Sequence, residues 1–147
     1  MKKLVVALFV SLALFGCSTA PTEAEQALVT TAWEWASDVD YYADMVIVGT
    51  AMAKTADDDL AQRSEEQAKE DIATIMNLVS DSSKAGLLDE LPDKYSDVKI
   101  SYASLCSAFS DIANNAVALA EYKGEELEVF RKACEKAGFT VKDTAHS

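Results

Sequence analysis

Glycine, proline and histidine are scarce in this chain of 147 residues, which contains five glycines, two prolines and one histidine. A turn-rich β fold needs glycine and proline between many short strands, so the composition argues against that class. The single histidine is His146, the penultimate residue. Most catalytic arrangements that depend on an imidazole base held by a third group are therefore excluded.

Sequence motifs for cofactors are absent as well. The chain has no Glu-x-x-His pair for a di-iron centre, no Cys-x-x-Cys-His for a haem, no glycine-rich phosphate loop and no nucleophile elbow. Asp38, Asp40 and Asp44 have the spacing that opens a calcium loop, but no glycine stands at its sixth position and Gly49 occupies its twelfth. We therefore expect no cofactor, no metal and no enzyme activity, while an enzyme that uses carboxylates alone stays open.

Positive charge is also sparse, with 13 basic residues against 25 acidic residues and a net charge of −12. The cations do not cluster beyond Arg131, Lys132 and Lys136. Nucleic-acid binding needs a basic patch, so we expect no nucleic-acid partner. High acidity is typical of a soluble surface, and recognition of a basic partner is the alternative.

The N-terminus has the pattern of a signal peptide. Lys2 and Lys3 precede an apolar segment from Leu4 to Phe15, which ends in the sequence Leu14-Phe15-Gly16-Cys17. Twelve residues form a helix of about 18 Å, too short to cross a hydrocarbon core of about 30 Å. The segment is therefore predicted to be removed during export.

The end of this segment resembles the lipobox of bacterial lipoproteins, with Leu14, Gly16 and Cys17 at the matching positions. The resemblance implies a signal peptide over residues 1–16 and covalent diacylglycerol and acyl chains such as palmitate on Cys17. It implies a membrane anchor on the extracytoplasmic side of the cell envelope, and Ser18 favours the outer membrane if the organism has one. An ordinary secretory signal with an incidental cysteine is the alternative.

Residues 17–22 are predicted to form a lipidated tether of at most about 18 Å beyond the cysteine. Loss of Lys2 and Lys3 with the signal leaves 25 acidic and 11 basic residues, a net charge of −14. Anionic lipid headgroups repel such a domain, so we expect it to work near the bilayer without lying flat on it.

Hydrophobic periodicity predicts an all-α fold, an antiparallel bundle of three long helices plus a short fourth C-terminal helix, over residues 23–139. The first and third helices carry seams with alternating steps of four and three residues. The second helix has a weaker stripe from Leu60 to Val79. The two seams are Leu28, Ala32, Trp35, Val39, Tyr42, Val46, Gly49 and Ala53, then Val98, Tyr102, Leu105, Phe109, Ile112, Ala116 and Leu119.

Helix boundaries follow from capping and turn residues. Asp57 to Asp59 mark the start of the second helix and Gly86 its end, with a linker from Leu87 to Asp93. Gly124 separates the third helix from the fourth, which ends at Gly138. Residues 140–147 are predicted to be a flexible tail.

Cys106 and Cys134 remain after lipidation of Cys17, and an oxidising compartment favours a disulfide between them. Helices folded back symmetrically about Gly124 would leave the two Cα atoms about 12 Å apart along the axis, which exceeds the usual separation in a disulfide. We expect the bond nevertheless, and two buried thiols are the alternative.

Aromatic residues supply the candidate contact surface. Trp33 and Trp35 point about 200° apart on a helix, so Trp33 and Tyr41 are expected near an edge of the bundle if Trp35 faces the core. Burial of Trp33 by the fourth helix is the alternative. The short fourth helix also predicts an open groove lined by Tyr95, with Tyr102, Leu87 or Leu88.

Three functions remain open at this point. The first is a non-catalytic interaction module that binds an envelope protein, of which a prophage lipoprotein that excludes incoming phage would be one instance. The second is a carrier or sensor of a small apolar ligand held between helices. The third is a carboxylate-based enzyme. The expected contact residues for the first are Trp33, Tyr41 and Tyr95.

Overall fold

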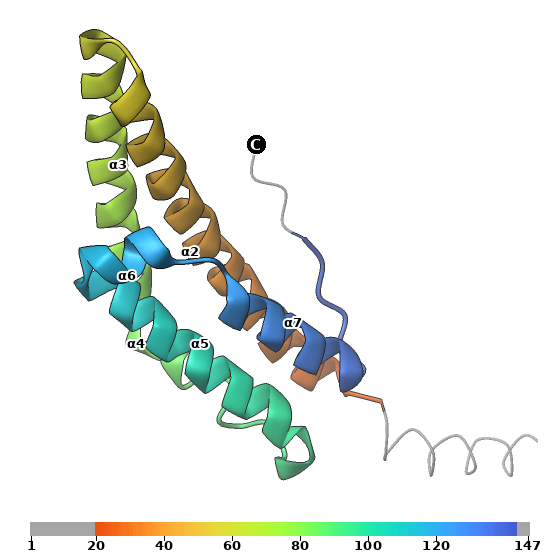
Figure 1. Cartoon of the computed structure of the whole chain (residues 1–147). Coiled ribbons are helices and arrows are strands. Elements are labelled where there is room, and N and C mark those ends of the chain that lie inside the picture. Colours follow the sequence, from red (N-terminus) through yellow and green to blue (C-terminus); the bar gives the residue numbers. More distant parts are fainter. Residues whose placement is uncertain (1–19, 144–147) are drawn as a thin grey trace, which may run out of the picture.

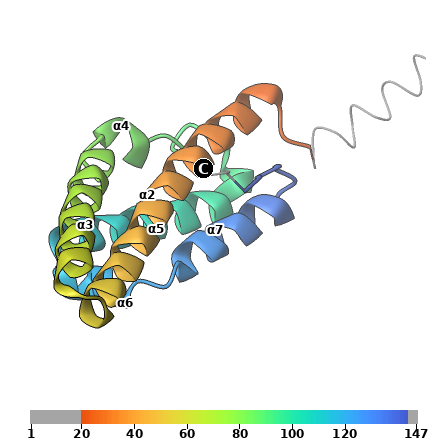
Figure 2. The ribbon, with the colours of Figure 1, turned by 90° about the horizontal axis from the view of Figure 1, so that it is seen from above.

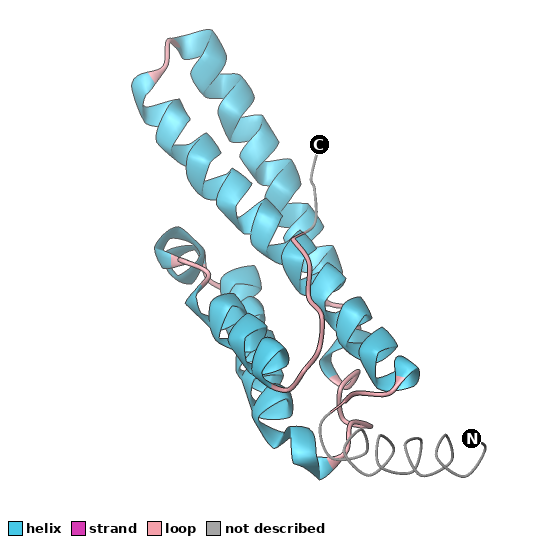
Figure 3. Cartoon of the chain, turned by 90° about the vertical axis from the view of Figure 1, so that its right-hand side faces the viewer, coloured by secondary structure: helices cyan, strands magenta, loops and turns pink. Residues whose placement is uncertain are grey.

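The computed structural model describes residues 20–143, and the predicted signal peptide and Cys17 lie outside them. Helices account for 80% of the structure, and the described residues contain no strand, which confirms the all-α class (Figure 3). The elements are α2 (Glu23–Thr55), α3 (Asp58–Val79), α4 (Ser82–Ala85), the 3-10 helix η1 (Asp93–Tyr95), α5 (Ser96–Asn114), α6 (Ala116–Glu121) and α7 (Glu125–Lys136).

Helix α2 begins and ends close to the predicted residues. Thr22 and Glu25 form a capping box, in which each side chain accepts a hydrogen bond from the other residue's backbone amide. At the other end, Asp57 accepts from the Leu60 amide and starts α3 after a short turn. The two helices lie close together at Gly49, where a Cβ would be in ordinary van der Waals contact with the Ser64 carbonyl oxygen at 3.6 Å. The result is the long α2–α3 hairpin of Figure 1.

Two predicted helices are each interrupted once. The second ends at Val79, and Asp81 caps the separate short helix α4 by accepting from the Ser83 amide. The third breaks at Asn115, whose backbone is extended and whose side chain accepts from the amides of Val117 and Ala118. Both breaks occur where an Asp or Asn side chain competes for backbone amides.

The core lies where α2, α5 and α7 meet, with α3 against the other side of α2 (Figures 1 and 2). The predicted seam of α5 and α6 is buried except at Ala116, and the seam of α2 is buried at four of its predicted positions. Aromatic rings fill the centre, where Trp35 and Phe109 pack edge to face at 5.5 Å. The buried residues of α2 are Val29, Ala32, Trp33, Trp35, Ala36, Ser37, Val39, Ala43 and Val46.

The outer end of the hairpin has no buried residue. Burial in α2 stops at Val46 and resumes in α3 only at Ala68. We call the intervening residues, 47–67, the hairpin tip. In Figure 1 this part of α2 and α3 projects beyond α5, α6 and α7. The tip therefore contributes no buried side chain to the core, although part of its α2 arm faces the end of α5 and helix α6.

The C-terminal segment folds back on α2 after α7 ends. Gly138 adopts a left-handed φ of 93°, and the following Phe139 is buried. Thr140 exchanges two hydrogen bonds of 2.9 Å with the Gln26 side chain. Residues 140–143, predicted to be part of a flexible tail, thus pair with α2, and residues 144–147 lie outside the described part.

Candidate functional site

Trp33 and Tyr95, two of the three predicted contact residues, are inside the protein. The Trp33 side chain is 5% exposed and stacks on Phe130 of α7 at 6.3 Å between ring centroids, and its Nε1 donates to the Lys142 carbonyl oxygen. Tyr95 is 6% exposed and packs on Phe139 at 4.8 Å. The expected exposure of Trp33 is therefore wrong, because the fourth helix and the C-terminal segment cover it. The open groove predicted at Tyr95 with Tyr102, Leu87 or Leu88 is also wrong, since Tyr95, Tyr102 and Leu88 are buried and Leu87 is half-buried.

Tyr41, the third predicted residue, is half-buried at one end of an accessible row of side chains on α2. Met45, Val48 and Met52 follow it at steps of four, three and four residues, which places all four on one helix face. Met45 is 36% exposed, Val48 48% and Met52 46%. We call these four residues the α2 stripe. It runs from the body of the molecule onto the hairpin tip.

A polar cleft of about 350 Å³ opens beside Tyr41, between α2 and α7. Helix α2 contributes side chains on consecutive turns, and the loop before α7 closes the far side. We call it the acidic cleft, because four of its residues are carboxylates and two are cations. Its lining residues are Trp33, Ser37, Asp40, Tyr41, Asp44, Lys123, Gly124, Leu127, Glu128, Arg131 and Asp143.

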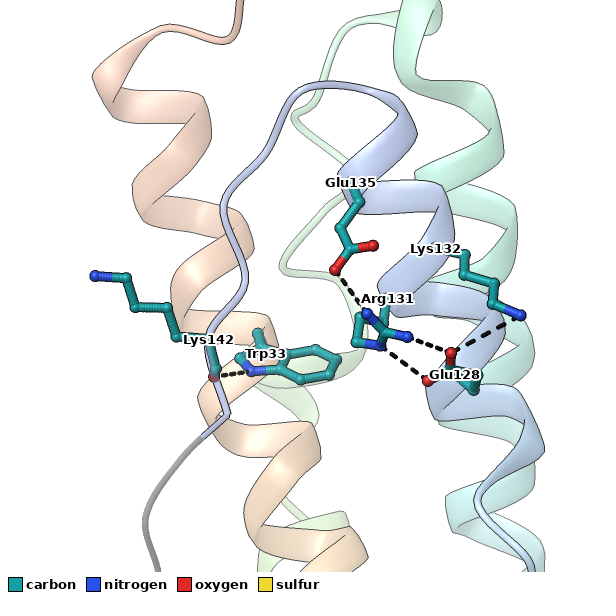
Figure 4. Close-up of polar contacts among 6 residues, drawn as sticks. All are labelled: Trp33, Glu128, Arg131, Lys132, Glu135 and Lys142. Carbon is teal, nitrogen blue, oxygen red and sulfur yellow. Dashed lines mark hydrogen bonds and ion pairs between the residues drawn. The ribbon is translucent and has the colours of Figure 1, made fainter.

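The α7 wall of the cleft is an ion network (Figure 4). Arg131 Nε donates to Glu128 at 2.8 Å, and Arg131 Nη1 donates to Glu135 at 2.7 Å. Hydrogen bonds from Arg131 lower the pKa of Glu128, with a smaller contribution from the charge of Lys132. The guanidinium of Arg131 is thus engaged by carboxylates of its own helix. In Figure 4 the Trp33 ring points from α2 toward this network.

The α2 wall carries two carboxylates on adjacent turns. Tyr122 donates its hydroxyl to Asp40 Oδ1 at 2.6 Å, which fixes one oxygen of Asp40. Partial burial, followed by the charge of Asp40, raises the pKa of Asp44. No ion pair joins either carboxylate to a cation of the described residues, although Lys123 also lines the cleft. This wall therefore has unneutralised negative charge.

These groups meet one requirement for catalysis by carboxylates, a raised pKa in a cleft. The two aspartates, however, come from successive turns of one helix and do not face each other across the cleft. Within residues 20–143, no three His, Cys, Asp or Glu side chains are grouped so that they could hold a metal ion. The arrangement is suited to binding a cation through charge and hydrogen bonds.

A second opening lies at the other side of α2, above α6. It is a groove of about 670 Å³ where the hairpin faces the end of α5 and helix α6. We call it the apolar groove, since most of its lining is aliphatic. Its lining residues are Val46, Ile47, Thr50, Ala51, Lys54, Thr55, Ile72, Ile112, Ala113, Asn114, Asn115, Ala116, Leu119 and Ala120.

Cys106 and Cys134 are free thiols, so the predicted disulfide is wrong in this structure. Cys134 is fully buried in the core, whereas Cys106 is half-buried beside Tyr102 and within the electrostatic reach of Asp89. The two sulfurs thus occupy different surroundings, in line with the axial mismatch worked out from the sequence. Burial raises the pKa of both thiols, that of Cys134 to about 12, so both are protonated at neutral pH.

No helix of the described residues is long and apolar enough to cross a membrane. Comparison of the chain with protein-family models, with curated proteins and with solved structures finds no match.

Sequence reasoning missed Ser37, Asp40 and Asp44 as members of one site. Their spacing with Trp33 places all four on one side of α2, and that signal was available. The opposite wall of the cleft could not be found from spacing along the chain, because Lys123 and Arg131 reach the cleft only through the docking of α7 on α2.

Proposed function

We propose that this protein is a lipid-anchored, non-catalytic interaction module of the cell envelope. In this proposal its hairpin tip binds an amphipathic, positively charged segment of another envelope protein. The domain is an antiparallel bundle of long helices whose short C-terminal helix leaves the far end of α2 uncovered. The observation that carries the proposal is that 21 consecutive residues, 47–67, include none that is buried while Val48, Met52 and Leu60 are 45–48% exposed.

Exposed apolar side chains at this density favour a contact surface. Scattered single hydrophobic residues are normal on a protein surface, but a row at heptad spacing along a projecting helix is the pattern of a helix-docking face. Val48 and Met52 belong to the α2 stripe, and Leu60 lies at the start of α3. A partner helix laid along the stripe would bury these side chains.

The net negative charge of the hairpin tip favours a positively charged partner. The hairpin tip carries five carboxylates and two cations, a net charge of −3. The carboxylates are Asp57, Asp58, Asp59, Glu65 and Glu66. An apolar segment flanked by lysine or arginine complements this surface, and the charges would raise the association rate more than the affinity.

The proposed anchor places this surface away from the membrane. Helix α2 starts at Glu23, six residues after Cys17, and its 33 residues span about 50 Å. The tether is attached to the N-terminal end of this helix, and the C-terminal end of the helix belongs to the hairpin tip. An upright α2 therefore reaches a partner about 50 Å from the lipid, farther than the short tether alone suggests.

Site-specific photo-cross-linking in intact envelopes tests the proposal. A photoreactive residue at Val48, Met52 or Leu60 is expected to label one envelope protein, in a peptide with an apolar face and flanking lysine or arginine. The matched control is Ile100 of α5, which is also aliphatic and 65% exposed. Equal labelling from Ile100, or labelling of an acidic segment, would contradict the proposal.

A second function is favoured by the apolar groove. Its volume of about 670 Å³ lies within the usual range of about 300–1,000 Å³ for small-molecule sites. The groove fits a carrier or sensor of a small apolar ligand. Native mass spectrometry of protein extracted from envelopes would show a bound ligand, and Ala51→Phe, which fills the groove, should remove it. The exposed Ala103→Phe on α5 is the control variant.

A further inference from the structure

We infer that the acidic cleft between α2 and α7 binds a primary alkylammonium group. The inference goes beyond the proposed function, since the cleft lies at the opposite end of the α2 stripe from the hairpin tip. The ligand would be either a free amine or the side chain of a lysine on another protein, because both present the same –NH₃⁺ group.

The first observation is a nearly buried serine whose hydroxyl has no hydrogen-bond partner among the described residues. Ser37 is 9% exposed, lines the cleft, and its hydroxyl makes no hydrogen bond with any described residue. A serine in a helix commonly donates to the carbonyl four residues earlier, as Thr50 does to Val46. Ser37 Oγ still has some accessible surface, since Tyr95 alone has a fully buried side-chain oxygen without a partner among the described residues, so a ligand in the cleft can reach the Ser37 hydroxyl.

The second observation is the charge beside this hydroxyl. Asp40 and Asp44 follow Ser37 at steps of three and four residues, so the three side chains lie on one face of α2. Tyr122 occupies one oxygen of Asp40 and leaves the other available. No described cation forms an ion pair with either aspartate.

The three acceptors match the three donors of a primary ammonium group. An –NH₃⁺ group has three N–H bonds and no acceptor, and it is a compact charge. Ser37 can accept one hydrogen bond and Asp40 and Asp44 one each. The Tyr41 ring and Leu127 line the same cleft and offer apolar contact to the methylene stem.

The two cations that line the cleft do not pair with these three acceptors. Arg131 is held by Glu128 and Glu135 on its own helix (Figure 4). Lys123 is exposed in the loop before α7 and forms no ion pair in the described structure. Lys123 could compete for the site, so Lys123→Gln is expected to leave binding unchanged or strengthen it.

NMR titration of the full, detergent-solubilised protein provides the test. The chain has two tryptophans, and the Trp33 indole lies at the cleft while the Trp35 indole donates to the Leu78 carbonyl inside the core. Butylammonium should shift the Trp33 indole signal saturably and leave the Trp35 signal in place. Butyltrimethylammonium, which has no N–H donor, should bind at least about tenfold more weakly.

Variants and ligand arms complete the test. Asp44→Asn and Ser37→Ala should each weaken butylammonium binding, the first by about tenfold or more, while Asp59→Asn on the hairpin tip should not change it. Spermidine and a peptide with an acetylated N-terminus and one unmodified lysine side chain distinguish a free amine from a protein lysine by which binds more tightly. Linear, unsaturable shifts, or equal binding to the wild-type protein and both cleft variants, would overturn the inference. Neither result bears on the hairpin tip, whose variants should leave the titration unchanged.

Discussion

Phe130→Ala is the substitution that tests most sharply how α7 is held on α2. The Phe130 side chain has no exposed surface and packs against Trp33 at 6.3 Å and Tyr102 at 5.2 Å between ring centroids. Truncating a buried phenylalanine costs about 3–5 kcal/mol, since the lost transfer free energy is joined by the cost of a cavity. Two aromatic pairs, each worth about 0.5–1.5 kcal/mol, favour the upper part of that range. We expect a loss of about 4 kcal/mol from a total of about 5–15 kcal/mol.

Urea unfolding followed by tryptophan fluorescence measures this loss. The denaturation midpoint should fall while the slope with denaturant stays unchanged, because α7 unfolds with the rest of the core. Val129→Ala is the matched control, since Val129 is the adjacent residue on α7 and is 58% exposed. It should cost less than about 0.5 kcal/mol. A loss below about 1 kcal/mol for Phe130→Ala would refute the docking of α7 described here, and with it the α7 wall of the acidic cleft.

Three further predictions concern the cleft and the thiols. Asp44→Asn should raise the melting temperature at pH 7 but not at pH 3. The pKa of Asp44 is raised in the folded state, so this carboxyl group lowers stability only as pH rises above the ordinary value of 3.8. Equal shifts in melting temperature at both pH values would argue against this explanation. Gly124→Ala should cost about 1–2 kcal/mol in urea unfolding, since φ is 74° and the new Cβ would lie 3.0 Å from Asp40 Oδ1. Alkylation after unfolding without reductant should label both Cys106 and Cys134, and an unlabelled pair would indicate a disulfide.

Much of the helical fold could be predicted from local signals. The Asp57 cap and the turn at Gly124 depend on residues close in the sequence, and both were found where expected, whereas four of the eight predicted α2 seam positions are buried. The break at Asn115 was missed because the hydrophobic seam continues through it to Leu119. Its signal, an Asn able to cap the next turn, is as local as the others but was outweighed by periodicity.

The candidate site was less predictable, because burial depends on contacts between distant segments. Trp33 is covered by Phe130 and by the Lys142 carbonyl, about a hundred residues later in the chain, and no periodicity of α2 reports such a contact. Tyr41 is half-buried, and its direction on α2 relative to Trp35 follows from helix geometry alone. The hairpin tip was missed because seam spacing alone does not say where the partner helices stop.

Mass spectrometry of the native protein isolated from envelopes tests the central claim, that the chain is anchored to the membrane by lipid on Cys17. The lipobox resemblance at Leu14, Gly16 and Cys17 predicts a first residue at Cys17 that carries diacylglycerol and acyl chains. A protein that retains Met1, or a mature terminus without fatty acid, would contradict the account.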